Sequence, residues 1–170
     1  MNLDVRLLRV ARTVGHTPAL DRGMAGFSRL GEHAGLWLAI GTVGQTLDRG
    51  RRTRWRRALG TVAGTYALNT AIKPVIGRRR PNLPDLPPLM GTPTGLSFPS
   101  AHASTSFAGA LAYSRLGLPA APLYALAVGL ALSRVYLGVH YPSDVLAGAV
   151  GGTLAGIVGM SGVDSVEGER

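Results

Sequence analysis

The hydrophobic residues of this chain fall into blocks that are separated by basic or Pro/Gly-rich breaks. Several blocks approach the roughly 20 residues that a helix needs to cross a bilayer. The pattern predicts five membrane-spanning helices, at residues 33–47, 58–76, 101–116, 120–139 and 144–160. The first is short, about 22 Å of helix, so we expect it to extend at its ends or the bilayer to thin around it.

Two amphipathic segments precede these blocks. Residues 3–14 place apolar side chains on one helical face and arginines on the other, and residues 19–30 mix both kinds in a similar way. The pattern is typical of helices that lie on a membrane surface, although a helix packed on a soluble core would share it. The predicted fold class is all-α, an integral-membrane helical bundle that follows amphipathic interfacial helices. The predicted division of the chain is surface helices at 1–32, a transmembrane bundle at 33–160 and a flexible polar C-terminal tail at 161–170.

Charge and composition narrow the classes of function. The formal net charge of +9 comes almost wholly from arginine, and Lys73 is the single lysine. The positive-inside rule places the arginine-rich loop 48–57 in the cytoplasm, and a short loop between two spans is a poor site for nucleic acid. The absence of cysteine excludes disulfides and cysteine-based metal or redox centres. The N-terminus lacks the continuous apolar stretch of a cleavable secretory signal.

Small residues recur at four-residue spacing in two of the predicted spans. They are Gly60 and Gly64, and Gly148, Gly152 and Gly156. Such spacing lets helix backbones approach closely in lipid, so we expect tight packing inside the bundle, with homodimerisation through the last helix as the alternative. Oligomeric state is left open by the sequence. The Pro-rich connection 77–99 has the length of a lid or headgroup-binding loop rather than of a plain connector.

Three groups of polar residues interrupt the apolar blocks. They are Lys73 with Arg80-Pro81, then Pro99-Ser100-Ala101-His102, then Ser133-Arg134 with His140 and Asp144. Because successive spans run in opposite directions, the ends of the second and fourth spans and the starts of the third and fifth lie at one face of the membrane. All three groups therefore meet there, and a soluble core offers no reason for this convergence.

These side chains together supply the parts of a phosphoryl-transfer site. Arg80 and Arg134 carry planar guanidinium groups that suit phosphate oxygens, and Lys73 adds a compact charge at the end of a polar stripe on its helix. Ser100 is predicted to cap the third helix, which leaves the first N–H groups of that helix free to hold an anion. The opposing interpretation is that buried ionisable residues merely pair with one another, as they often do in membrane helices.

Two histidines and an aspartate complete this set. One histidine can attack the phosphorus while the other protonates the leaving oxygen, and His102 lies one turn into the third helix, beside the bound anion. Asp144 follows His140 by four residues across Pro142, so its carboxylate can accept one imidazole N–H and leave the other nitrogen free to attack. No set of metal ligands is needed, and no cofactor is implied.

The ordered set of three groups resembles the type 2 phosphatidic acid phosphatase family, kin to bacterial acid phosphatases and vanadium haloperoxidases, over about residues 58–160. The resemblance implies a phosphohistidine intermediate on His140, which Asp144 orients, with His102 as the general acid. It also implies phosphate binding by Lys73, Arg80, Arg134 and Ser100. Ala101 stands where the family usually has glycine; the amide donor is kept, so we expect activity to persist and headgroup fit to be the affected property.

One span and the amphipathic segments precede the first motif, which is similar to a short branch of the family that includes polyprenyl-phosphoribose phosphatases. We expect a multi-pass plasma-membrane enzyme that removes the 5-phosphate of decaprenyl-phosphoribose in cell-wall precursor synthesis, with an extracytoplasmic site. The arginines of the N-terminal segment, with Arg78 and Arg79, favour the opposite orientation, in which the site is cytoplasmic. Undecaprenyl diphosphate, phosphatidylglycerophosphate and phosphatidate are the competing substrates. The rivals in other classes are a vanadium haloperoxidase and a non-catalytic protein that binds or transports lipid phosphate.

Glu32 and His33 open the first span at the face where the three polar groups meet. Both are candidates for contact with the headgroup of the lipid. The plainer interpretation is that Glu32 is a favourable acidic residue at a helix N-terminus and His33 an interfacial side chain.

Overall fold

The computed structural model describes residues 2–161, and over that range the chain is helical with one isolated β-bridge, between Arg79 and Leu96. The elements are α1 (Leu3–Thr13), α2 (Pro18–Arg29), the 3-10 turn η1 (Glu32–Ala34), α3 (Gly35–Leu47), the 3-10 turn η2 (Arg49–Arg51), α4 (Arg52–Ile76), α5 (Ala101–Ser114), α6 (Ala120–Tyr136) and α7 (Pro142–Met160). The all-α prediction is confirmed. The predicted C-terminal tail lies, apart from Ser161, outside the described residues.

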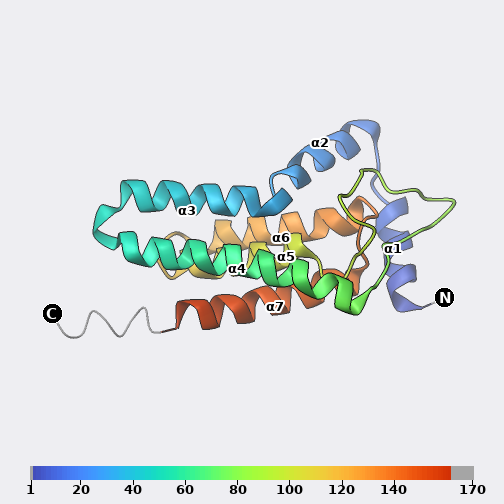
Figure 1. Cartoon of the computed structure of the whole chain (residues 1–170). Coiled ribbons are helices and arrows are strands. Elements are labelled where there is room, and N and C mark those ends of the chain that lie inside the picture. Colours follow the sequence, from blue (N-terminus) through green and yellow to red (C-terminus); the bar gives the residue numbers. More distant parts are fainter. Residues whose placement is uncertain (1, 162–170) are drawn as a thin grey trace.

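Helices α3 to α7 run side by side as an elongated bundle, and α1 lies across one end of it (Figure 1). The long connection between α4 and α5 is at the same end. The starts of α5 and α7 meet there, since the Ser100 amide donates to the Asp144 carbonyl oxygen at 3.0 Å. The predicted convergence of the three polar groups at one end of the bundle is therefore correct.

Within the described residues, α7 is the one helix with both the length and the apolar composition to cross a membrane. Helix α6 is also apolar but shorter, and α3 has 13 residues and α5 has 14. Helix α4 has 25 residues but begins among arginines. Length and composition in the structure thus single out fewer spans than the hydrophobic blocks of the sequence.

The start of α4 is where the predicted boundaries were wrong. The arginine-rich segment 48–57 was expected to be a loop, yet η2 and the first turns of α4 occupy it. Asp48 accepts hydrogen bonds from the Arg51 amide at 3.2 Å and from the Trp55 indole N–H at 3.1 Å. Asp48 thus caps η2 and is bonded to the buried Trp55 in the first turn of α4.

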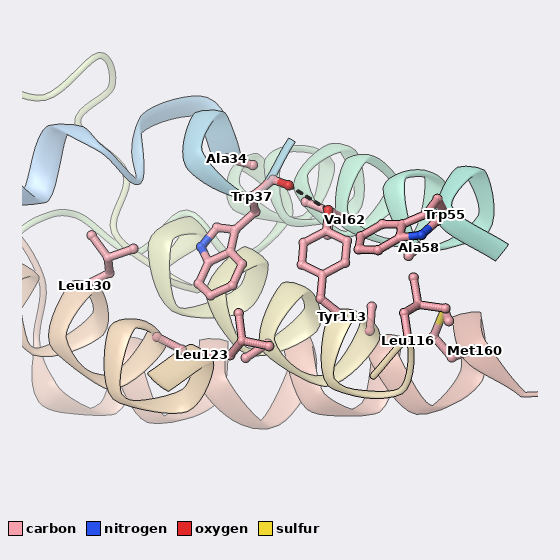
Figure 2. Packing of buried hydrophobic residues seen from close by; sticks show 13 residues of the cluster. Ala34, Trp37, Trp55, Ala58, Val62, Tyr113, Leu116, Leu123, Leu130 and Met160 are labelled. Carbon is pink, nitrogen blue, oxygen red and sulfur yellow. Dashed lines mark hydrogen bonds between the residues drawn. The ribbon is translucent and has the colours of Figure 1, made fainter. Parts of the chain in front are cut away.

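Aromatic side chains form the centre of the apolar core, away from the polar end of the bundle (Figure 2). The rings of Trp37 and Trp55 stack on Tyr113, with centroids 6.3 and 5.7 Å away. The Tyr113 hydroxyl donates to the Trp37 carbonyl oxygen at 2.6 Å, so this buried phenol has its polar atom paired. The core packs α3, α4 and α5 against one another and so fixes the relative positions of these helices.

Only one of the two glycine patterns packs against another helix of the chain. Gly148, Gly152 and Gly156 let α7 lie directly on α5, since an added Cβ at Gly152 would be 2.0 Å from the Ser104 carbonyl oxygen. This interface inside the chain, rather than a dimer, uses the α7 pattern. Gly60 and Gly64 have no atom within 4 Å of a built Cβ. The expectation that these two pack tightly inside the bundle was wrong, because their face of α4 points outward.

The N-terminal helix presents its apolar side outward. Leu3, Val10 and Val14 are each more than half exposed, as suits a helix facing lipid at a membrane surface. Arg12, predicted on the opposite polar face, is buried and donates to the Pro87 carbonyl oxygen at 2.7 Å. Helix α1 is therefore attached to the 77–100 connection as well as lying on the bundle.

Candidate active site

One cavity at the polar end of the bundle collects most of the predicted site residues. It measures about 120 Å³. Its lining residues are Glu32, His33, Tyr66, Thr70, Lys73, Arg80, Pro93, Thr94, Ala101, His102, Arg134 and His140. Of the predicted set, Ser100 and Asp144 do not line it and lie buried behind the wall. Side chains or backbone from α4, α5, α6 and η1 thus meet at one site.

Lys73 is held at the end of the polar stripe on α4. Thr65, Asn69 and Lys73 repeat every four residues, and all three are buried, as the pattern predicted. The Lys73 ammonium donates to the Pro99 carbonyl oxygen at 2.7 Å, which fixes it beside the start of α5. The ammonium also lies 3.4 Å from the Ser97 carbonyl oxygen, and Lys73 lines the cavity.

Arg80 spans the cavity from the connection that follows α4. Its Nε donates to the Thr94 carbonyl oxygen at 2.8 Å, and its NH1 donates to the Val139 carbonyl oxygen at 2.8 Å. The same NH1 lies 3.0 Å from His140 Nε2. A guanidinium only donates, so the Nε2 of His140 carries a lone pair and its Nδ1 carries the proton.

His140 lies in the loop that joins α6 to α7. Its Nδ1 faces the Asp144 carboxylate at 3.5 Å, with Asp144 fully buried. Burial of the ring, with the nearby cations Arg80, Arg134 and Lys73, lowers the pKa of His140 and outweighs the effect of Asp144. The imidazole is therefore neutral at neutral pH, with the lone pair of Nε2 directed toward the cavity.

Arg134 and His102 are both held by one residue of α2. The Arg134 NH1 donates to the Ser28 hydroxyl at 2.7 Å, and His102 Nε2 lies 3.0 Å from the Ser28 carbonyl oxygen. Because a carbonyl only accepts, Nε2 of His102 must carry a proton and Nδ1 is left for other partners. Gly31 allows this approach, since an added Cβ would lie 2.7 Å from the His102 ring.

Ser100 occupies the N-cap position of α5 but does not cap it. No side-chain capping bond forms, and the buried Ser100 Oγ has no hydrogen-bond partner in the protein. The predicted side-chain capping role was therefore wrong, and the Ser100 amide donates to the Asp144 carbonyl oxygen. Because Ser100 does not line the cavity, its role in phosphate binding stays a prediction.

Glu32 and His33 form the outer wall of the cavity. His33 has a left-handed backbone, with φ of 51°, and Ala34 follows with φ of 60°. The His33 Nδ1 lies 2.7 Å from the Tyr66 hydroxyl, which attaches the η1 turn to α4. A left-handed backbone is costly for residues other than glycine and concentrates at functional sites.

Sequence reasoning missed four residues of this region. Ser28 lies in a segment that was interpreted only as amphipathic. Tyr66 was counted as one of the apolar residues of α4 and was given no role in the site. Arg78 binds the Asp144 carboxylate and Asp4 binds Arg78, both at 2.7 to 2.8 Å. For Arg78 the signal was present, since three consecutive arginines end the Lys73 motif.

Residues 54–165, more than half of the chain, match the PAP2 superfamily. The chain belongs to the PAP2 superfamily. This match confirms the predicted family resemblance. The protein is a membrane phosphatase. Helices α1 to α3 precede the matched range, so Ser28, Glu32 and His33 come from outside it.

PAP2 proteins with a named activity resemble this chain over most of their length. The decaprenylphosphoryl-5-phosphoribose phosphatase of Mycolicibacterium smegmatis is 40% identical over 149 residues, which cover 85% of this chain and 80% of that protein. The protein of the same name from Mycobacterium tuberculosis H37Rv is 40% identical over 154 residues, covering 90% and 84%.

Two solved PAP2-type structures share the fold. Aquifex aeolicus LpxE superposes with a TM-score of 0.78 at 27% identity, covering 94% of this chain and 96% of that one. A transmembrane PAP2-type phosphatidylglycerolphosphate phosphatase from Bacillus subtilis superposes with a TM-score of 0.81 at 26% identity, covering 98% and 87%. The all-helical fold of this chain thus matches that of PAP2 membrane phosphatases.

Proposed function

We propose that this protein is a metal-independent lipid phosphatase that removes the 5-phosphate of decaprenylphosphoryl-5-phosphoribose through a phosphohistidine intermediate. The observation that carries the chemistry is the lone pair of His140 Nε2, aimed into a cavity that three cations line. The named phosphatases that are 40% identical support the choice of substrate.

The proposed first half-reaction is attack of His140 Nε2 on phosphorus. A phosphate that enters the cavity takes the place of the Nε2 contact with Arg80 and receives the guanidinium groups of Arg80 and Arg134. The P–O bond to the sugar breaks as the N–P bond forms, and His102 gives a proton to the leaving sugar oxygen. Asp144 compensates the positive charge that develops on the imidazole.

The second half-reaction releases inorganic phosphate. Water attacks the phosphohistidine, and the neutral His102 left by the first step accepts a proton from that water. The N–P bond breaks, and His140 regains its lone pair. Lys73 and the two arginines hold the phosphoryl oxygens through both steps, so the charge that a metal would neutralise is covered by fixed cations.

Recognition of the rest of the lipid is proposed for the outer wall of the cavity. Glu32 offers a carboxylate and His33 a ring nitrogen among the residues that line the cavity. Those groups suit the hydroxyls of a sugar next to the phosphate. The Ala101 methyl lies in the same wall, where it narrows the space beside the headgroup.

For membrane topology we propose five spanning helices, α3 to α7, with α1 and α2 on the surface at the active-site end. The loop between α3 and α4 and the start of α4 carry six arginines, Arg49, Arg51, Arg52, Arg54, Arg56 and Arg57. The positive-inside rule puts this end in the cytoplasm and the cavity on the extracytoplasmic side.

The test is phosphate release by the purified full-length protein in detergent with EDTA present. The substrates are decaprenylphosphoryl-5-phosphoribose, undecaprenyl diphosphate, phosphatidylglycerophosphate and phosphatidate. We expect phosphate to be released preferentially from the first lipid, and this activity to be lost in His140→Ala. We also expect the substrate phosphate to become attached to the wild-type protein in an acid-labile form, but not to that variant. Release from none of the four by folded protein would contradict the proposed function. Preferred release from another lipid would correct the substrate alone.

A further inference from the structure

Arg78 and Arg80 lie on the same side of the connection that follows α4. The bridge between Arg79 and Leu96 shows that this segment is extended, so alternate side chains point the same way. Arg80 accordingly reaches His140 and Arg78 reaches Asp144, while the Arg79 side chain is exposed. Gly77, with φ of 67°, ends α4 and starts this extended run.

Arg78 connects the N-terminal surface helix to the fully buried Asp144. Its NH1 donates to Asp144 Oδ1 at 2.7 Å, and its NH2 donates to Asp4 Oδ2 at 2.8 Å. Ser143 strengthens the link, because its amide donates to Asp4 at 3.0 Å. The Arg78 guanidinium also lies over the Tyr141 ring, 4.3 Å from the centroid. Partners on several sides thus fix the position of this guanidinium.

The two oxygens of Asp144 have separate tasks. Oδ1 is bound by Arg78, and Oδ2 accepts the Tyr141 amide at 2.8 Å and faces His140 Nδ1. A fully buried carboxylate needs a partner of opposite charge. Arg78 supplies that charge and also prevents rotation of the carboxylate, which would turn Oδ2 away from the imidazole.

We propose that Arg78 is a positioning residue for the reaction, which holds the Asp144 carboxylate toward His140, and that Asp4 on α1 holds Arg78 in place. This inference rests on the proposed role of His140 as the nucleophile. It makes the surface helix part of the active site, since one residue of α1 is joined to His140 through two ion pairs. Loss of Arg78 leaves the three cavity cations in place and affects the chemical step rather than phosphate binding.

The test uses the full-length protein and the four-lipid panel described above. We expect Arg78→Gln to lower kcat by about 10- to 100-fold, the range known for groups that orient a reacting ligand, with KM changed by less than about threefold. Arg78→Lys should recover part of the loss, because an ammonium keeps the charge but not the two-sided contact. Arg79→Gln, in the neighbouring exposed arginine, is the matched control and should stay within about twofold of wild type.

A double-mutant cycle separates positioning from mere structural support. If Arg78 acts through Asp144, Arg78→Gln placed in an Asp144→Asn background should lower kcat by less than about twofold further. Undiminished loss in that background, or a rise in KM alone, would overturn the proposal. If Arg78→Gln does not fold, the same cycle is run with Arg78→Lys and with Asp4→Asn. Turnover that survives in His140→Ala would instead show that the proposed function has failed.

Discussion

The hydroxyl of Ser28 on α2 accepts a hydrogen bond from the guanidinium of Arg134 at 2.7 Å, across 106 positions of the chain. The backbone carbonyl of the same residue receives His102 at 3.0 Å. Ser28 is fully buried although its helix was expected to lie on a membrane surface. A surface helix outside the matched PAP2 range therefore orients two residues of the cavity.

Replacement of Ser28 by alanine should weaken phosphate binding. Arg134 would lose its neutral partner, and a hydrogen bond to a charged group is worth about 1.5–3 kcal/mol. We expect KM to rise about tenfold with a smaller change in kcat, because the carbonyl that orients His102 is kept. Steady-state kinetics on the preferred lipid measure KM and kcat. The control is Ser114→Ala, at the end of α5 far from the cavity. An unchanged KM would show that Arg134 is held without Ser28.

The close contact of α7 on α5 predicts different fates for two adjacent glycines. Gly152→Ala would place a methyl 2.0 Å from the Ser104 carbonyl oxygen, whereas Gly151→Ala meets no atom within 4 Å. We expect Gly152→Ala to destabilise the protein by about 1–3 kcal/mol or more and Gly151→Ala to be neutral or slightly stabilising. Thermal unfolding in detergent measures both variants. Equal melting temperatures would contradict the packing.

The burial of His140 predicts that activity continues into acidic solution. The neutral ring is the reacting form, and its pKa lies below the usual 6.5, so protonation removes activity only as the pH falls through the lowered value. We expect kcat/KM to have an acidic midpoint below pH 6.5, because protonation of His140 removes the nucleophilic lone pair. The substrate phosphate titrates near pH 6 and is measured separately by phosphorus NMR. An acidic midpoint above 6.5 would contradict the buried, neutral nucleophile.

Chelation tests the role given to the cations. Lys73, Arg80 and Arg134 neutralise the phosphate in the proposed mechanism, so EDTA at millimolar concentration should leave kcat within about twofold. Replacing any one of the three by glutamine should instead raise KM strongly, because a desolvated charge contact is lost. If EDTA inhibits the enzyme and added divalent metal restores activity, the metal-independent mechanism is contradicted.

Several features of the site followed from the sequence because they depend on local spacing. Asn69 and Lys73 are four residues apart and share a buried face, and His140 and Asp144 meet across the start of α7. The alternation of spans brought the three motifs to one end without any knowledge of packing. Arg78 lies between Lys73 and Arg80, but the motif did not single it out.

Other features depended on which helices are in contact, which cannot be read from the sequence pattern. The spacing of Gly60 and Gly64 equals that of Gly148 and Gly152, yet only the second pair meets a neighbour. Ser100 occupies the N-cap position of α5, but its side chain makes no capping hydrogen bond. Periodicity shows which face of a helix is apolar or small, not which element lies against it.

The sequence by itself determined the all-α class, the family and the identity of the cations and histidines. Motifs and hydrophobic blocks depend only on residues that are near one another in the chain, so the sequence pattern shows them directly. Tertiary structure alone decided that Ser28 holds Arg134 and that Asp4 reaches Asp144 through Arg78. Those contacts join residues far apart in the chain and leave no periodic trace. They form only where α1 and α2 fold back onto the end of the bundle (Figure 1).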